Sequence, residues 1–237
     1  MDLLKSKTGR IMIESHRGVE HTHPENSWPA IQAARDEKAD FIEVDVQLSA
    51  DGIPFLHHNY EMAEGGWCHA LDWKQLEART IGGEKLPLLR DVLVWARDED
   101  VNLSLDLKPG FHPVGRLAKH VTQLIQTSDC WGHVMLLAWD HQELLAIKNS
   151  FPQATTRITF HGRGVDIVGS AKAARCNAVG LTYGVARPKE VEELHRAGFA
   201  AALGLMWELD TDMVKQLDVD IVCWGQPAEA RKRLGIK

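Results

Sequence analysis

The sequence has little of what marks an exported, membrane-embedded or nucleic-acid-binding protein. No apolar run approaches the length of a bilayer span, and no apolar targeting segment follows Met1. The net charge is -6, from 27 basic and 33 acidic residues, so the composition does not favour a nucleic acid partner. The four cysteines lack metal-binding spacing. We therefore expect a cytoplasmic protein with reduced thiols and no integral membrane segment.

Linkers, repeats and a glycine-rich phosphate loop are also missing, and the chain instead alternates between apolar runs and helix-like segments. This order is typical of parallel βαβ units, and 237 residues suit an α/β fold of the (β/α)8 TIM-barrel type better than an open doubly wound sheet. Residues 54–85 interrupt the rhythm, so we expect a small insertion after the second strand of a single domain spanning residues 1–237. The expected strands cover residues 10–15, 40–48, 101–107, 133–139, 154–160, 177–182, 199–207 and 220–224.

Carboxylates stand near the ends of the second and third expected strands. Glu43 and Asp45 are two residues apart, so they share one face of a strand, and Asp106 lies near the end of the next. In a barrel these strand ends meet at one mouth. Clustered carboxylates repel one another unless a cation compensates them, and oxygen donors suit a hard divalent cation, Mg²⁺ or Ca²⁺. The sequence therefore predicts a divalent metal site made of Glu43, Asp45 and Asp106.

Basic side chains gather at the same expected mouth. His16 and Arg17 end the first run, Lys108 follows the third, and His57 and His58 lie at the end of a short apolar run in the insertion. Arginine and lysine neutralise phosphate oxygens, and two histidines with pKa values near neutrality can share acid and base roles. Together with a metal, these residues favour a metal–phosphate site and phosphoryl-transfer chemistry.

The order of these residues resembles the signature of the glycerophosphodiester phosphodiesterase family. The matching motifs are His16-Arg17-Gly18, Pro24-Glu25-Asn26, Glu43-Val44-Asp45, and Asp51-Gly52 followed by His58. The spacing favours His58 over His57 as the second catalytic histidine. The segment 103–108 resembles the family's third metal-ligand strand, and residues 86–93 resemble the helix before it. The resemblance implies the same barrel with its small insertion.

The resemblance also implies an activity and roles for the residues. Family members cleave glycerol-based phosphodiesters, and a neighbouring substrate hydroxyl attacks phosphorus through a cyclic phosphate. For this chain we expect metal-dependent hydrolysis of glycerophosphodiesters or related sugar phosphodiesters to a phosphomonoester and an alcohol. His16 and His58 would be the acid–base pair, and Arg17 and Lys108 would bind the phosphate. The three carboxylates would hold the cation. Asn26 is expected to brace its loop and to be the N-cap of the next helix.

Three positions depart from the family pattern, and one of them is the usual Thr-Asp before the last proline, which reads Gly225-Gln226 after Trp224. The usual aspartate after the second histidine is Asn59, which cannot carry a charge to tune His58. The usual glutamate of the third strand is Asp106, which is one methylene shorter. Barrel enzymes of the sphingomyelinase D type use the same Asp-x-Lys, so a sphingomyelinase D or lysophospholipase D-like activity stays open. The substitutions at Asn59 and Asp106 also leave open the alternative that the protein is a non-catalytic barrel that binds phosphorylated ligands.

Three of the eight tryptophans close expected strands, and these are Trp139, Trp207 and Trp224. In a barrel they would stand around the mouth, where tryptophan faces stack on sugars or on cationic head groups. They are candidate substrate-binding residues for a leaving group larger than glycerol, although core packing is an equally simple explanation. The sequence does not determine the leaving group, the preferred cation or the oligomeric state.

Overall fold

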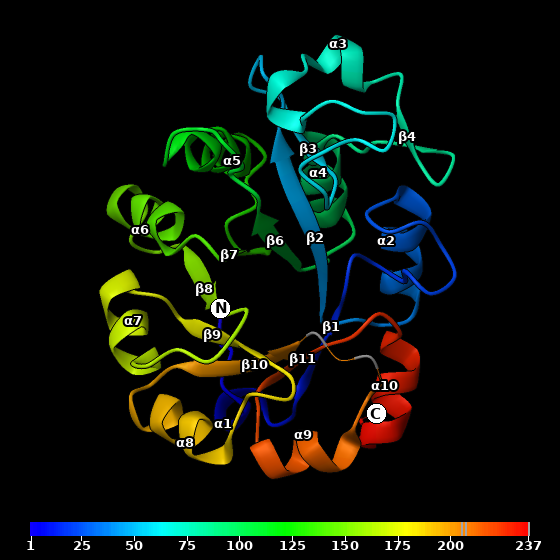
Figure 1. Cartoon of the computed structure of the whole chain (residues 1–237). Coiled ribbons are helices and arrows are strands. Elements are labelled where there is room, and N and C mark those ends of the chain that lie inside the picture. The colour runs from blue at the N-terminus through cyan, green and yellow to red at the C-terminus, as the bar shows by residue number, and fades with distance from the viewer. Residues whose placement is uncertain (205, 207, 237) are drawn as a thin grey trace.

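A computed structural model describes residues 1–204, 206 and 208–236, and it is a closed (β/α)8 barrel (Figure 1). Parallel pairing runs in the order β1-β11-β10-β9-β8-β7-β6-β2, and β1 also pairs with β2, which closes the ring. The predicted fold class is confirmed. The barrel strands are β1 Met12–Ser15, β2 Phe41–Leu48, β6 Leu103–Leu107, β7 Val134–Ala138, β8 Thr155–Thr159, β9 Ala178–Thr182, β10 Ala200–Gly204 and β11 Ile221–Cys223.

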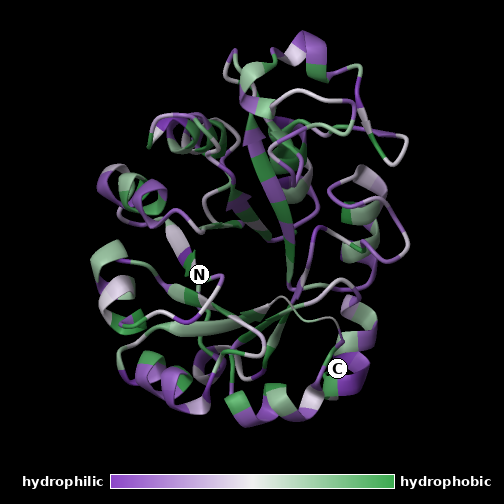
Figure 2. Cartoon of the chain, viewed as in Figure 1, coloured by the Kyte–Doolittle hydropathy of each residue, from purple (hydrophilic) through white to green (hydrophobic). Residues whose placement is uncertain are grey.

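Helices follow the strands and surround the barrel, and Figure 2 shows them striped by hydrophobic and hydrophilic residues. In α5, for example, Leu117, Val121 and Ile125 recur every four residues and are buried, which is the pattern of an amphipathic helix. The helices are α1 Lys5–Thr8, α2 Trp28–Asp36, α4 Leu89–Asp98, α5 Arg116–Thr127, α6 His141–Ser150, α7 Ile167–Ala174, α8 Pro188–Arg196, α9 Thr211–Leu217 and α10 Pro227–Leu234. Among the described residues, no helix is long and apolar enough to cross a bilayer.

The start of α2 differs from the expectation. Its N-cap is Ser27, whose side chain accepts a hydrogen bond from the backbone N–H of Ala30, so the prediction of Asn26 as the cap was wrong. Both residue types are good caps, and local sequence could not separate them. Asn26 is left free to make a longer-range contact in the site described below.

The segment after β2 folds as a small unit beside the barrel, seen in cyan beyond the tip of β2 in Figure 1. It starts with β3, Pro54–Leu56, which runs antiparallel to β2. It continues through a 3-10 turn, a short helix and a two-stranded ribbon, which are η1 Cys68–Ala70, α3 Trp73–Leu76, β4 Thr80–Ile81 and β5 Glu84–Lys85. A separate cluster of buried side chains holds it together, and the cluster is Phe55, Met62, Cys68, Leu76 and Leu86.

The inside of the barrel divides into an apolar end and a polar end. Buried Met12, Phe41, Met135 and Ile221 pack together, and Leu3 from the N-terminal segment packs with them. Farther along β1 and β2, the buried polar residues Glu14 and Glu43 replace apolar ones, and Asp106 is buried on neighbouring β6. Buried charge is unfavourable unless it is compensated. The polar end is therefore the candidate location of a functional site, since these residues do not serve apolar packing.

Candidate active site

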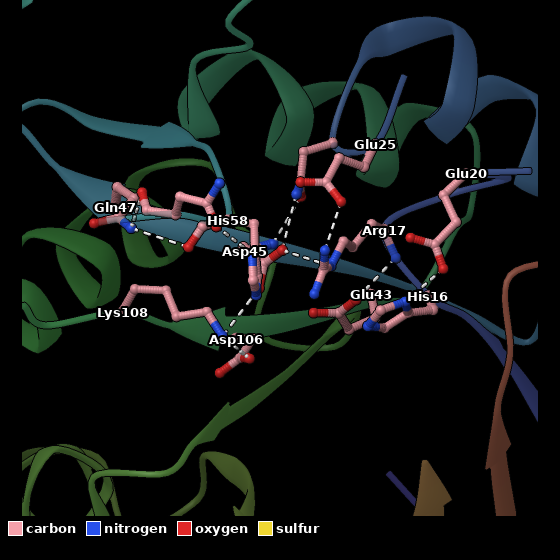
Figure 3. A network of polar contacts seen from close by, with 12 residues as sticks. His16, Arg17, Glu20, Glu25, Glu43, Asp45, Gln47, His58, Asp106 and Lys108 are labelled. Atoms are coloured by element: carbon pink, nitrogen blue, oxygen red, sulfur yellow. Dashed lines mark hydrogen bonds and ion pairs between the residues drawn. The ribbon is translucent and has the colours of Figure 1, made fainter. Parts of the chain in front are cut away.

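A cluster of three buried carboxylates is formed by side chains of the neighbouring strands β2 and β6 (Figure 3). Glu43 and Asp45 share the inner face of β2, and Asp45 is in register with Asp106 of β6. Each residue offers a carboxylate oxygen, and these oxygens all lie within 4.8 Å of one another. The structure thus brings together the three residues that the sequence predicts as metal ligands.

The electrostatics of the cluster show that negative charge is in excess. Burial raises the pKa of Glu43 to about 8, and the neighbouring charge of Asp45 adds to this effect. Burial likewise raises the pKa of Asp106 to about 6, although Lys108 opposes the shift. Oδ1 of Asp106 is buried and has no hydrogen-bond partner among the described residues. A set of oxygen donors with an unused lone pair and raised pKa values fits a hard divalent cation.

Two cationic side chains flank the carboxylates and hold Asp45 ionised. Arg17 Nε lies 3.3 Å from Oδ2 of Asp45, and Lys108 Nζ lies 3.1 Å from its Oδ1 and also pairs with Asp106. Although burial alone would raise it, the pKa of Asp45 is lowered by the charges of Lys108 and Arg17. The backbone N–H of Arg17 donates to Oε2 of Glu43 at 2.9 Å. Arg17 and Lys108 therefore contact the same carboxylates that would hold a metal ion.

The turn after β1 fixes His16 and Arg17 beside the cluster. Gly18 has φ +78°, and a Cβ there would lie 2.5 Å from the backbone carbon of Ala30, so this close approach requires glycine. Asn26 connects the turn to β2, because its amide donates to Oδ2 of Asp45 at 2.8 Å and accepts from the Asp45 backbone N–H at 2.8 Å. The motif around Asn26 thus positions one carboxylate of the cluster.

The two predicted catalytic histidines have opposite electrostatic settings. Nδ1 of His16 lies 2.7 Å from Oε1 of Glu20. Burial alone would lower the pKa of His16, but the hydrogen bond to Glu20 and the charge of Glu43 raise it to about 9. His58 donates from Nδ1 to the amide oxygen of Asn59 at 2.9 Å, and burial keeps the pKa of His58 below its ordinary value. These environments favour the charged form of His16 and the neutral form of His58.

One cavity joins these groups. His16, His58, Arg17, Lys108 and the three carboxylates all line it, together with side chains from β7 to β11. His57 is buried, with Nε2 3.4 Å from the carbonyl oxygen of Glu61, and it is not among the lining residues that the structure describes. The spacing argument that chose His58 over His57 therefore agrees with which ring reaches the cavity.

Comparison with known proteins places this site in a family. The model of the glycerophosphoryl diester phosphodiesterase family matches residues 16–228. The chain belongs to this family. A glycerophosphodiester phosphodiesterase from Caldanaerobacter subterraneus subsp. tengcongensis is 25% identical over 155 residues, which cover 60% of this chain and 64% of that protein. Protein YqiK of Bacillus subtilis is 28% identical over 144 residues, covering 56% and 59%. The chain thus matches less than two thirds of the length of these relatives.

Solved structures of low identity share the barrel of this phosphodiesterase-family chain. An Oleispira antarctica phosphodiesterase in complex with the product sn-glycerol-3-phosphate has a TM-score of 0.87 at 16% identity, covering 97% of this chain and 99% of that one. A glycerophosphodiester phosphodiesterase from Parabacteroides distasonis has a TM-score of 0.86 at 19% identity, covering 95% and 97%. The likeness extends over nearly the whole fold.

The three tryptophans considered from the sequence of this family member lie in different places. Trp139 lines the cavity and is 46% exposed. Its ring centroid lies 4.5 Å from that of His161, with the two rings tilted by 38°, and 4.8 Å from Lys108 Nζ. Trp224 is buried beside His21 and is not among the described lining residues. Trp207 lies outside the described residues. The geometry thus retains Trp139 as a candidate contact for substrate.

Sequence reasoning missed residues that support the family motifs. Glu20 holds His16, and the distance of four residues between them in a loop gave no signal. Gln47 donates to the backbone carbonyls of His58 and Asn59 at 3.3 and 3.0 Å, and its place two residues after Asp45 on β2 could have revealed it. Arg157, a charged residue within an apolar run, was another available signal. It is buried in β8 and lines the cavity.

Proposed function

We propose that the protein is a metal-dependent phosphodiesterase that hydrolyses glycerophosphodiesters or related sugar phosphodiesters to a phosphomonoester and an alcohol. The observation that carries the proposal is that two histidines with opposite pKa shifts line one cavity with the carboxylate cluster. Membership of the glycerophosphoryl diester phosphodiesterase family and the names of the relatives support the same chemistry.

The proposed cofactor is Mg²⁺ or Ca²⁺, held by Glu43, Asp45 and Asp106. The buried, unused oxygen of Asp106 and the raised pKa of Glu43 both fit a cation. When bound, such a cation supplies positive charge that polarises phosphate oxygens and acidifies a nearby substrate hydroxyl. Its identity is not set by the ligand types, because both ions accept carboxylate oxygens.

The chain's own side chains would position the phosphate and move the protons. Arg17 and Lys108 already contact the acidic cluster, so a phosphate bound beside it would meet both cations. His58 is neutral, and with its Nδ1–H donated to Asn59 it presents a free Nε2 lone pair that can take the proton of the attacking hydroxyl. His16, held charged by Glu20, can give a proton to the leaving alcohol.

The proposed reaction runs in two balanced steps. The neighbouring hydroxyl of the substrate attacks phosphorus as His58 takes its proton, and the bond to the leaving alcohol breaks as His16 protonates that oxygen. The product of this step is a cyclic phosphate. Water then opens the ring, with His16 now acting as the base and His58 as the acid, which restores both histidines and releases the phosphomonoester.

A second candidate is a lysophospholipase D or sphingomyelinase D-like activity. Asp106 and Lys108 form the Asp-x-Lys motif of that enzyme type. Shortly after β6, Phe111 forms an exposed aromatic pair with Trp67. Phe111 is 72% exposed, and its ring centroid lies 5.6 Å from that of Trp67 in the insertion. Exposed aromatic surface of this kind suits contact with a lipid chain.

A substrate panel with metal present tests the proposal and separates the candidates. The purified chain with Mg²⁺ or Ca²⁺ should release alcohol from glycerophosphocholine or glycerophosphoinositol, and chelation should abolish this. Activity on lysophosphatidylcholine or sphingomyelin alone would instead favour the second candidate. No activity on any diester with either cation would contradict the proposal and favour a non-catalytic phosphate-ligand-binding barrel.

Histidine variants test the assigned roles. His16→Gln and His58→Gln should each lower kcat by about 10²- to 10⁴-fold, the usual contribution of acid–base catalysis, while Mg²⁺ affinity stays unchanged. His57→Gln is the matched control, since its ring is adjacent in sequence but is not among the described lining residues. A folded His57→Gln variant should keep most of the activity. Full activity of either active-site variant would contradict the mechanism.

A further inference from the structure

An arginine inside the barrel has hydrogen-bond donors that the fold does not use. Arg157 lies at the centre of β8, is 5% exposed and lines the cavity. Its Nη2 donates to Oε2 of Glu14 in β1 at 2.7 Å. Its Nε and Nη1 are buried without a hydrogen-bond partner within the part of the chain that the structure describes. Buried donors left unpaired are unfavourable, so Arg157 is suited to meeting a ligand in the cavity.

A second unused group lies on the same face of β8. Thr159 is two residues from Arg157, so both side chains point to the inside of the barrel, and both line the cavity. The Thr159 hydroxyl is also buried without a partner among the described residues. The two side chains together offer N–H donors and a hydroxyl that can donate or accept.

The neighbouring strands leave room beside these groups. In TIM barrels, bulky branched side chains usually fill the interior. Here the cavity is lined instead by Gly180 of β9 and by Ala202 and Gly204 of β10, and Gly180 is in register with Ala202. Small residues at these positions extend the cavity across the barrel from the carboxylates of β2 and β6. Space therefore adjoins the unused donors.

Charge indicates which kind of ligand group fits this space. The guanidinium of Arg157 already pairs with buried Glu14, so its positive charge is compensated. An anionic ligand group would meet the carboxylate of Glu14, whereas a neutral hydroxyl can accept from Arg157 and exchange a hydrogen bond with Thr159. We propose that Arg157 and Thr159 form a subsite for the hydroxyl groups of a polyol or sugar arm of the phosphodiester. This inference rests on the proposed function, because the phosphate is assigned to Arg17 and Lys108.

Binding of two phosphomonoesters that differ in their hydroxyl groups tests the subsite without requiring turnover. The probes are glycerol 3-phosphate and n-propyl phosphate, titrated by calorimetry into the full chain with Mg²⁺ present. The wild type should bind glycerol 3-phosphate more tightly. Thr159→Val, which removes a hydroxyl and keeps the shape, should reduce that preference by about two- to tenfold, as expected for one hydrogen bond. Its affinity for n-propyl phosphate should be unchanged.

The same strand offers a matched control. Thr156 of β8 also has a buried hydroxyl without a partner among the described residues, but it does not belong to the described cavity lining. Thr156→Val should therefore keep the wild-type preference. The double variant Glu14→Gln/Arg157→Met, which removes the guanidinium without leaving Glu14 charged, should lower the preference by about tenfold or more. Direct metal contacts of the hydroxyls contribute equally in every variant and cancel in this comparison.

The subsite would be overturned by a wild type that binds glycerol 3-phosphate no more tightly than n-propyl phosphate. It would also be overturned by a folded Thr159→Val variant that keeps the full preference for glycerol 3-phosphate. If the double variant does not fold, comparison of Thr159→Val with its control Thr156→Val still tests the subsite. Failure of the proposed function looks different, because a chain that shows the preference but cleaves no diester would contradict the activity and support the subsite. A chain that cleaves diesters but shows no preference would overturn the subsite alone.

Discussion

At the scale of single residues, the two cavity histidines differ because their Nδ1 partners differ. Glu20 is a carboxylate and holds a proton on His16, whereas Asn59 is a neutral amide and leaves His58 to the effect of burial. A neutral residue at position 59 therefore widens the difference between the pKa values of the two histidines. Pairs of titratable groups whose environments separate their pKa values are well suited to acid–base catalysis.

Replacing Asn59 with aspartate should narrow that gap. A carboxylate next to His58 favours its charged form, so the Asn59→Asp variant should raise the pKa of His58. Because the neutral form of His58 is the proposed base, the acidic limb of the kcat/KM profile should move to higher pH by about one unit. Measurement of kcat/KM between pH 5 and pH 10 checks this, using about ten pH values.

Glu20, the partner of His16, provides a control that should shift the other limb of the pH profile. Glu20→Gln removes the carboxylate that helps to keep the pKa of His16 at about 9, so the basic limb should move to lower pH while the acidic limb stays in place. An acidic limb that does not move in Asn59→Asp would show that His58 is not the base of the first step.

At the scale of elements, contacts between neighbouring helices stabilise the barrel where local sequence gives no capping residue. The N-cap of α5 is Gly115, which has no side chain to cap the helix. Buried Glu143 of α6 supplies the missing acceptor, since its carboxylate accepts from the backbone N–H groups of Gly115 and Ala118, both at 2.6 Å. A carboxylate at a helix N-terminus also interacts favourably with the helix dipole. The α5–α6 pair is therefore joined by a cap provided by another helix.

Removal of this cap should lower stability without changing the chemistry. Glu143→Ala leaves two helix N–H groups without their acceptor, which should lower the free energy of unfolding by about 1–3 kcal/mol. Urea denaturation measures this change. Glu192→Ala is the control, because its ion pair with Arg196 is exposed and such pairs contribute about 0–1 kcal/mol. A stability equal to wild type in Glu143→Ala would contradict the capping role, and kcat of the folded variant should be unchanged.

The same elements show what sequence could and could not predict. Apolar runs and helical spacing are local patterns, so the eight barrel strands and the insertion after β2 were predictable within a few residues. The clustering of the carboxylates was predictable because strand alternation places Glu43 and Asp45 on one face. Contacts between distant segments carry no local signal, which is why the pairing of Asn26 with Asp45 and of Glu14 with Arg157 required the structure.

At the scale of the whole molecule, folding concentrates acidic groups that the unfolded chain would keep apart. The folded-state pKa of Glu43 is about 8, well above its ordinary value of 4.5. Its contribution to the free energy of unfolding is therefore complete below pH 4.5 and is lost as the pH rises through about 8. A bound cation would replace the proton, so metal should stabilise the protein more at pH 8 than at pH 6.

Metal binding near neutrality should consequently release protons. At pH 7 Glu43 is mostly protonated in the metal-free protein, and a ligand carboxylate must be ionised, so Mg²⁺ binding should release about one proton. Calorimetry in two buffers of different ionisation enthalpy measures this number. The Glu43→Gln variant has no proton to lose at this position and should release fewer. Equal release by both proteins would show that the proton comes from another group.

The closure of the barrel between β1 and β2 has a mechanical consequence. This junction has two residue pairs in register, Glu14 with Phe41 and Ser15 with Ile42, whereas β2 and β6 share five. The proposed proton donor His16 follows β1, on the opposite side of that short seam from the carboxylates of β2 and β6. The β10–β11 junction is equally short, but it does not separate His16 from these carboxylates. We expect that opening of the β1–β2 junction on heating would move His16 away from the carboxylates, so that turnover would fail before the protein unfolds.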